Sequence, residues 1–156
     1  MKIALINENS QAAKNGIIEA ALKKVVEPMG HEVVNYGMYA ADDAAQLTYV
    51  QCGILAAILL NSGAADYVIT GCGTGEGAML ALNSFPGPKE RVEPEQRNKK
   101  ILDGVRAATF KPLIECLKSI DQDLLKGAIA GEKFSELFFA SCRDENLAAY
   151  IKSLLA

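Results

Sequence analysis

A glycine-rich segment brings a thiol and a carboxylate close together. The segment is Gly71-Cys72-Gly73-Thr74-Gly75-Glu76-Gly77, with glycines at alternate positions. Glycine tolerates positive φ angles and lets a ligand approach the backbone, so several N–H groups can point into one cavity. A helix that follows would add its positive N-terminal end. This arrangement suits proton abstraction next to a carbonyl, because the N–H groups can hold the enediolate oxygen that develops.

The segment has other interpretations. It lacks the lysine of a P-loop, and its glycine spacing differs from the dinucleotide-binding fingerprint. The glycines could serve only a tight turn that lets a helix pack on a strand. Cys72 is the better candidate for the base, since a helix N-terminus favours a thiolate. Glu76 could then be a second proton carrier or contact substrate hydroxyls, or it could only place a favourable charge on the first helical turn.

Alternating strands and helices lead up to this segment. We expect strands at residues 2–7, 31–36 and 66–70, with Ser10 as the N-cap of a helix at 11–27. A second helix should begin at Asp42 or Asp43 and end near Gly63, and a third should run from the turn to about residue 85. The apolar stripes of the first two helices are Ile17, Ile18, Ala21, Leu22 and Val25, and Leu47, Val50, Ile54 and Ile58.

This order predicts an α/β fold with a doubly wound, Rossmann-like parallel sheet that is covered on both faces. The crossovers should be right-handed. Ligands bind beyond the carboxyl ends of the strands in such sheets. The polar run Asn7-Glu8-Asn9-Ser10 and the glycine-rich turn should therefore lie on the same rim.

The chain changes character after residue 87. Helices are expected at residues 94–108, 112–120, 121–130 and 144–155, and residues 136–141 could be strand or helix, with helix favoured. We therefore divide the chain into an α/β domain at residues 1–87 and a helical C-terminal extension at 88–156. Only three strands are recognisable. One edge of the third strand lacks a neighbour, so a homodimer or a higher homo-oligomer is expected.

Composition limits the partners. The chain has 156 residues, a formal net charge of -3 and no tryptophan, so nucleic acid is an unexpected partner. No leader segment is visible, the run at residues 53–60 is too short to span a bilayer, and we expect a cytoplasmic protein with reduced cysteines. The four cysteines form no CxxC pair and His31 is the only histidine, so neither a zinc site nor any other cofactor is expected.

Residues 71–77, with the following Ala78-Met79-Leu80-Ala81-Leu82-Asn83 and Pro86-Gly87, resemble the signature of the ribose-5-phosphate isomerase B and galactose-6-phosphate isomerase family. The acidic rim at residues 7–9, Tyr49 and Asp66 are similar as well. The resemblance covers about residues 1–87. It implies a cofactor-free isomerase that interconverts aldose and ketose phosphates of pentoses or hexoses through an enediolate. It also implies a dimer with shared active sites.

The resemblance assigns roles residue by residue. Cys72 matches the proton-abstracting cysteine of one branch of the family, and Glu76 the glutamate base of the other. The residues that would hold the enediolate are Thr74 and the amides of Gly73, Gly75 and Gly77. The residues that would contact substrate are Glu8, Asn9, Ser10 and Tyr49.

Several positions depart from the family pattern. Glu8 replaces the usual Asp, Asn9 the usual His, and Thr48 and Val50 an Asp and a Pro. The two later strands, which carry a ring-opening histidine, an asparagine and phosphate-binding arginines, are not recognisable after Gly87. The alternative function is therefore a non-catalytic module that binds a sugar phosphate or another anion, and a fragment without a ligand is the third hypothesis.

Overall fold

The computed structural model describes residues 1–87 and 113–156. Three strands, β1 (Lys2–Asn7), β2 (Glu32–Asn35) and β3 (Tyr67–Gly71), form a parallel sheet in the order β2-β1-β3. The expected α/β class and the three strands are thereby confirmed. The register pairs Asn7 with Gly71 at the carboxyl edge, so the end of β1 lies directly beside the start of the glycine-rich turn.

The described residues contain seven α-helices and two short 3-10 helices. The α-helices are α1 (Ala12–Val26), α2 (Tyr49–Asn61), α3 (Glu76–Asn83), α5 (Leu113–Ser119), α6 (Gln122–Ala128), α7 (Phe134–Ser141) and α8 (Glu145–Leu155). The 3-10 helices are η1 (Asn9–Gln11) and η2 (Glu27–Met29). The helix expected at residues 94–108 lies outside the described residues.

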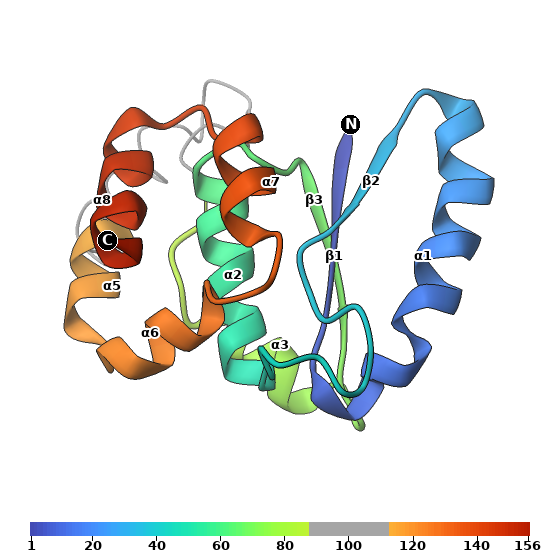
Figure 1. Cartoon of the computed structure of the whole chain (residues 1–156), viewed down its shortest axis with the longest axis horizontal. Helices are drawn as coiled ribbons and strands as arrows, with labels where there is room; N and C mark the ends of the chain where they lie inside the picture. Colours follow the sequence, from blue (N-terminus) through green and yellow to red (C-terminus); the bar gives the residue numbers. More distant parts are fainter. Residues whose placement is uncertain (88–112) are drawn as a thin grey trace, which may run out of the picture.

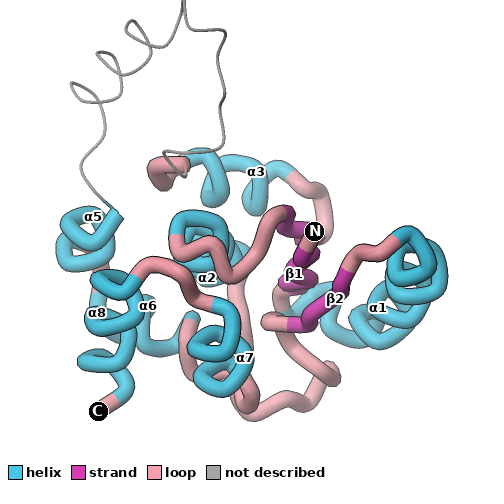
Figure 2. The backbone as a smooth tube through the Cα atoms, turned by 90° about the horizontal axis from the view of Figure 1, so that it is seen from above, coloured by secondary structure: helices cyan, strands magenta, loops and turns pink. Residues whose placement is uncertain are grey.

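The elements form layers. Figure 1 shows α1 on one side of the sheet and α2 on the other. The view from above shows α3, α2 and α7 side by side, with α5, α6 and α8 beyond them (Figure 2). The ring of Tyr36 meets the ring of Phe134 at 6.4 Å between centroids, and Phe134 stacks on Phe138 at 5.2 Å. These contacts fix α7 over β2.

Helix α2 is buried over most of its length. Every residue from Gln51 to Leu59 is buried, so this helix reaches solvent only at its first and last turns. The helix begins later than expected, at Tyr49. The prediction of a cap at Asp42 or Asp43 is wrong because Thr48 forms a capping box with Gln51, whose Oε1 accepts from the Thr48 N–H at 2.9 Å.

Helix α1 also departs from the expectation. Ser10 is not its N-cap: Ser10 lies in η1, where its N–H and hydroxyl both donate to the carboxylate of Glu8. The expected apolar stripe is partly outside the core, since Ile17 is 72% and Val25 63% exposed. No second helix flanks α1 on its face of the sheet in the described residues, which leaves its outer side in solvent (Figure 2).

The C-terminal helices share their core with the α/β part. Leu117, Leu125, Phe138 and Ile151 are fully or almost fully buried in the same cluster as Ile54 of α2. Asp121 and Asp144 cap α6 and α8 by accepting the N–H groups of the third residues of these helices, at 2.8 and 2.9 Å. The segment at 136–141 is helical, as favoured from the sequence. No helix in the described ranges is long and apolar enough to cross a membrane.

The close approach of α2 and α3 depends on a glycine. A Cβ added at Gly53 would lie 2.9 Å from the backbone carbon and the Cβ of Ala81. We predict that Gly53→Ala lowers the free energy of unfolding by about 1–3 kcal/mol, because the two helices must separate. The matched control is Gly16→Ala in α1, where a Cβ would meet nothing within 4 Å. This substitution should raise the free energy of unfolding by about 0.5–1 kcal/mol. Urea unfolding of both variants tests this, and equal effects would contradict it.

The prediction of a homodimer or higher homo-oligomer depends on the edge of β3 that faces away from β1. In the described residues β1 is the one strand that pairs with β3, and Tyr67 on β3 is 58% exposed. We expect light scattering to report a homodimer or larger, which Tyr67→Lys weakens because a charge on an edge strand opposes pairing. Ile17→Lys on α1 is the control. A monomer at every concentration, or dissociation by Ile17→Lys alone, would contradict the role of the β3 edge.

Candidate active site

The glycine-rich turn has a defined geometry around Cys72. Gly75, the N-cap of α3, adopts φ 84° and ψ -23°, a left-handed conformation that glycine takes without strain. This conformation aims the Gly75 N–H at the sulfur of Cys72, with 3.2 Å between nitrogen and Sγ. In this structure the Gly75 N–H therefore donates to the sulfur of Cys72 and is not open to a ligand oxygen.

Two neighbouring backbone donors of the turn have no acceptor in the described part of the chain. Neither the Gly73 N–H nor the Gly77 N–H has an acceptor among residues 1–87 and 113–156, and Gly73 is exposed. Thr74 is exposed as well, and its hydroxyl accepts from the Glu76 N–H at 3.4 Å. The turn can thus offer two backbone N–H groups to an oxygen of a ligand beside the sulfur of Cys72.

Cys72 and Glu76 are held differently. Cys72 is half-buried and fixed by the Gly75 amide. Glu76 is exposed at the first turn of α3, and no described residue forms a hydrogen bond or ion pair with its carboxylate. The carboxylate therefore keeps its rotamer freedom, whereas the sulfur has a fixed position from which it can act on a ligand carbon.

The β1 rim lies next to this turn through the sheet register. Glu8 is buried and caps η1, and the Asn9 N–H donates to the carbonyl of Leu47 at 2.8 Å. Asn9 and Ser10 are exposed. Since Asn7 pairs with Gly71, Glu8 and Cys72 follow the ends of adjacent parallel strands. The structure thus brings together the two segments that the sequence placed on one rim.

Tyr49 closes the other side of the turn. A Cβ added at Gly77 would lie 3.1 Å from Cδ2 of the Tyr49 ring. The ring therefore packs on the backbone of α3 where that helix begins, and half of it stays exposed. Every residue that the sequence proposed for the site thus lies on one of three adjoining segments: the β1 rim, the glycine-rich turn and the start of α2.

A second thiol lies beneath the site. Cys52 of α2 is fully buried, and burial raises the pKa of its thiol to about 12. The hydroxyl of Thr70 acts in the opposite direction on this pKa, while negative charge at Glu8 or Cys72 would raise it further. Cys52 therefore lies within electrostatic range of Glu8 and Cys72. The thiol of Cys52 therefore stays protonated, whereas a catalytic base must ionise.

Sequence reasoning missed a buried set of amides behind the rim. Asn7, Asn15 and Asn35 are all buried, and the Asn7 Nδ2 donates to Asn15 Oδ1 at 2.9 Å. The available signal was that Asn7 and Asn35 each end an apolar strand. Which side chains they meet depends on contacts between β1, α1 and β2, and the sequence pattern does not specify these.

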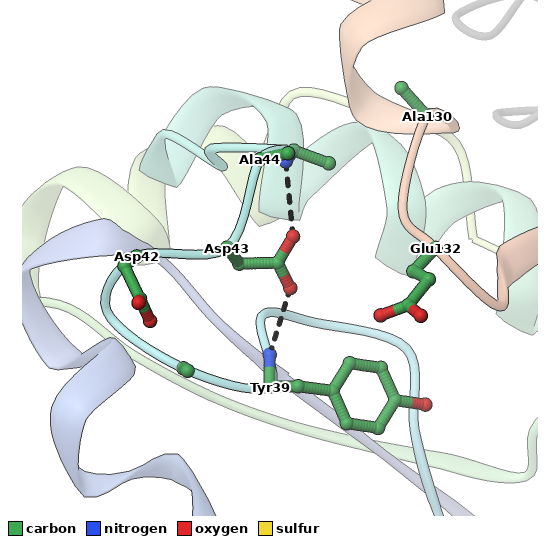
Figure 3. Close-up of a pocket in the computed structure, with 8 residues that line it drawn as sticks. Tyr39, Asp42, Asp43, Ala44, Ala130 and Glu132 are labelled. Carbon is green, nitrogen blue, oxygen red and sulfur yellow. Dashed lines mark hydrogen bonds between the residues drawn. The ribbon is translucent and has the colours of Figure 1, made fainter.

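A cavity of about 520 Å³ lies away from the turn. It is lined by the loop after β2, including Tyr39 and Asp42, and by Ala130 and Glu132 before α7 (Figure 3). Its Asp43 carboxylate accepts the N–H groups of Tyr39 and Ala45 at 3.1 and 3.0 Å, so this acid holds the loop. The cavity contains none of the predicted site residues.

The described residues provide no metal centre and no arginine at the rim. No group of three or more His, Cys, Asp and Glu in this part of the chain could hold a metal ion. Arg143 is the one arginine in this part, and it packs against Gly63 before β3, at the opposite edge of the sheet. Arg91, Arg97 and Arg106 lie outside the described residues. His31 also lies at the opposite edge, where its Nδ1 is 3.3 Å from the amino group of Met1.

A parallel sheet with a glycine-rich turn beside β1 and β3, where the strand order reverses, defines a Rossmann-like protein, and the candidate site lies at that crevice. A family model described as Ribose/Galactose Isomerase matches residues 3–89, more than half of the chain. The chain therefore belongs to the ribose/galactose isomerase family. A second model, described as Ribose-5-phosphate isomerase, matches residues 108–154. No curated protein matches the chain.

Two solved structures are similar over the whole chain. One is a 4-deoxy-L-threo-5-hexosulose-uronate ketol-isomerase complexed with a tartrate, at 46% identity and a TM-score of 0.87, covering 99% of each chain. The other is ribose-5-phosphate isomerase LacAB_rpiB from Vibrio parahaemolyticus, at 37% identity and a TM-score of 0.86, again covering 99% of each chain. Both neighbours are sugar isomerases, and their similarity extends through the C-terminal helices.

The buried thiol predicts a pH dependence of stability. Because the pKa of Cys52 rises from 9.0 to about 12 on folding, the native state keeps a proton that the unfolded state loses above pH 9. The stability from this neutral thiol is complete below pH 9 and declines as the pH rises towards 12. Urea unfolding between pH 7 and 11 should therefore show a steeper decline for the wild type than for Cys52→Ala. Parallel declines would contradict this assignment.

Proposed function

We propose that the chain is an aldose–ketose isomerase that acts on an open-chain pentose or hexose phosphate through an enediolate. The observation that carries the proposal is the Gly75 N–H on the sulfur of Cys72 at 3.2 Å, in a turn whose neighbouring N–H groups are open. A base and oxyanion donors beside one another are what proton abstraction next to a carbonyl requires. Membership of a sugar isomerase family supports the reaction class.

The proposed reaction moves one carbon-bound proton. The Cys72 thiolate takes the proton from the carbon next to the substrate carbonyl, and the electron pair of that C–H bond passes to the carbonyl oxygen as the enediolate forms. The N–H groups of Gly73 and Gly77 hold this oxygen. The Cys72 thiol then returns the proton to the neighbouring carbon. Glu76 carries the second proton between the two oxygens, for which its mobile, exposed carboxylate is suited.

A carboxylate is a second candidate for the acid group of the substrate, beside a phosphate. The neighbour with 46% identity acts, by its description, on 4-deoxy-L-threo-5-hexosulose uronate, a carboxylated sugar. The same enediolate chemistry serves both substrates, since each has a carbonyl next to a carbon that carries a hydroxyl and a proton.

The alternative is a binding module that has lost the reaction. Loss of the family's later histidine and arginines would leave a cradle that binds sugar phosphates without turnover. The fixed sulfur at Cys72 favours catalysis over this alternative. We expect the protein to act in the cytoplasm, as a homodimer or higher homo-oligomer, without metal or nucleotide.

Solvent isotope exchange tests the proposal. The full-length protein is incubated in D2O with D-ribose 5-phosphate, galactose 6-phosphate or 4-deoxy-L-threo-5-hexosulose uronate, and the proton next to the carbonyl is followed by NMR. Cys72→Ser should slow exchange by about 10²-fold or more, the scale for losing a general base, while binding persists. Glu76→Gln should cost less, since its role is the second proton. Chelator treatment should leave the rate unchanged.

Three outcomes would overturn parts of this assignment. If Glu76→Gln abolishes exchange and Cys72→Ser does not, the two roles are reversed. If neither variant changes the rate, the glycine-rich turn is not the active site. If the wild type binds a sugar and exchanges no proton, the chain is the non-catalytic module.

A further inference from the structure

We propose that Asn7 is a substrate-binding residue whose Oδ1 accepts a hydrogen bond from a sugar hydroxyl at the start of the catalytic turn. The inference rests on the proposed function and names a contact that neither the sequence nor the comparisons assign. Its basis is a set of buried amides, Asn7, Asn15 and Asn35, whose hydrogen bonds leave Asn7 Oδ1 as the one side-chain oxygen of the three with no donor among the described residues.

Backbone groups fix the orientation of these amides. The Met38 carbonyl can only accept, and it receives the Nδ2 groups of both Asn15 and Asn35. The Gly37 N–H can only donate, and it lies 2.9 Å from Asn35 Oδ1. Rotating either amide by 180° would therefore place like groups against each other. The orientation of Asn15 follows, with its Oδ1 pointing away from Met38 and towards Asn7.

The orientation of Asn7 follows in turn. Asn15 Oδ1 needs a donor, and Asn7 Nδ2 supplies it at 2.9 Å. Asn7 Oδ1 must then face the other way. A Cβ added at Gly71 would lie 3.2 Å from this oxygen, so the oxygen lies against the last residue of β3, immediately before Cys72. Asn7 is only 2% exposed, and no donor in residues 1–87 or 113–156 reaches its Oδ1.

A carbonyl oxygen in this position selects a neutral donor. A ligand hydroxyl that donates to this oxygen would give it the hydrogen bond that no described residue provides. The partial negative charge on Oδ1 disfavours a phosphate or carboxylate at this point, so the acid group of the substrate lies elsewhere. An amide neither gains nor loses a proton near neutral pH, so Asn7 orients a hydroxyl and takes no part in proton transfer.

Side-chain NMR of the full-length protein tests this contact. The 15N-labelled protein is titrated separately with D-ribose 5-phosphate and 4-deoxy-L-threo-5-hexosulose uronate, and the Asn7 amide signal is identified by its absence in Asn7→Ser. We expect that signal to shift with saturation by whichever sugar undergoes exchange. The Asn61 side-chain amide, bonded to the carbonyls of Ala57 and Pro86 at 2.8 and 2.9 Å, is the internal control and should not move.

Kinetics separate a binding role from a structural one. Asn7→Ser should lower kcat/KM by about tenfold, mainly through KM, the scale of one hydrogen bond. Ser62→Ala is the matched control: Ser62 is equally buried, its hydroxyl donates to the Leu59 carbonyl at 3.1 Å, and it lies before β3 at the opposite edge of the sheet. This variant should lose stability and keep kcat/KM within about twofold, because no lost contact reaches the turn.

The outcomes are distinguishable from those of the proposed function. Exchange in the wild type with an unmoved Asn7 signal at saturation overturns the role of Asn7 and leaves the isomerase proposal intact. Absence of exchange with all three sugars of the exchange experiment overturns the isomerase proposal, and this inference with it. If Asn7→Ser fails to fold, the titration of the wild type still decides, with Asn7 then assigned through backbone-correlated experiments.

Discussion

The burial of α2 from Gln51 to Leu59 is the constraint on which the remaining architecture depends. A helix that is apolar on all sides cannot be covered by a sheet alone. The sheet covers one side of α2, α3 approaches a second side through Gly53, and the C-terminal helices cover what is left. The C-terminal helices therefore complete the core around α2: Leu117, Leu125 and Phe138 are buried in the same cluster as Ile54 and Ile58.

The same helix sets the geometry of the site. Its capped start at Thr48 places the Tyr49 ring against Gly77, and its buried Cys52 lies under the rim. The parallel register of β1 and β3 then aligns the residues that follow the two strands. The candidate site thus consists of short exposed segments on a rigid support, which suits a reaction that needs a base held at a fixed distance from a carbon.

Local chemistry made much of this predictable from the sequence. The apolar strands and the turn at residues 71–77 depend on periodicity and on glycine, which act over a few residues. The start of α2 was mispredicted because Asp43 and Thr48 are both good caps, and the partner Gln51 decided between them. The exposed side of α1 and the amide contacts of Asn7 depend on which elements pack together, and hydrophobic periodicity carries no information about that.

The two thiols near the rim show why position matters more than residue type. Cys52 and Cys72 lie close enough for the charge of one to affect the other, yet their surroundings differ. Apolar burial disfavours the thiolate of Cys52, whereas Cys72 is half-buried and its sulfur accepts the Gly75 N–H. The same residue type is therefore a neutral core residue at position 52 and a candidate base at position 72.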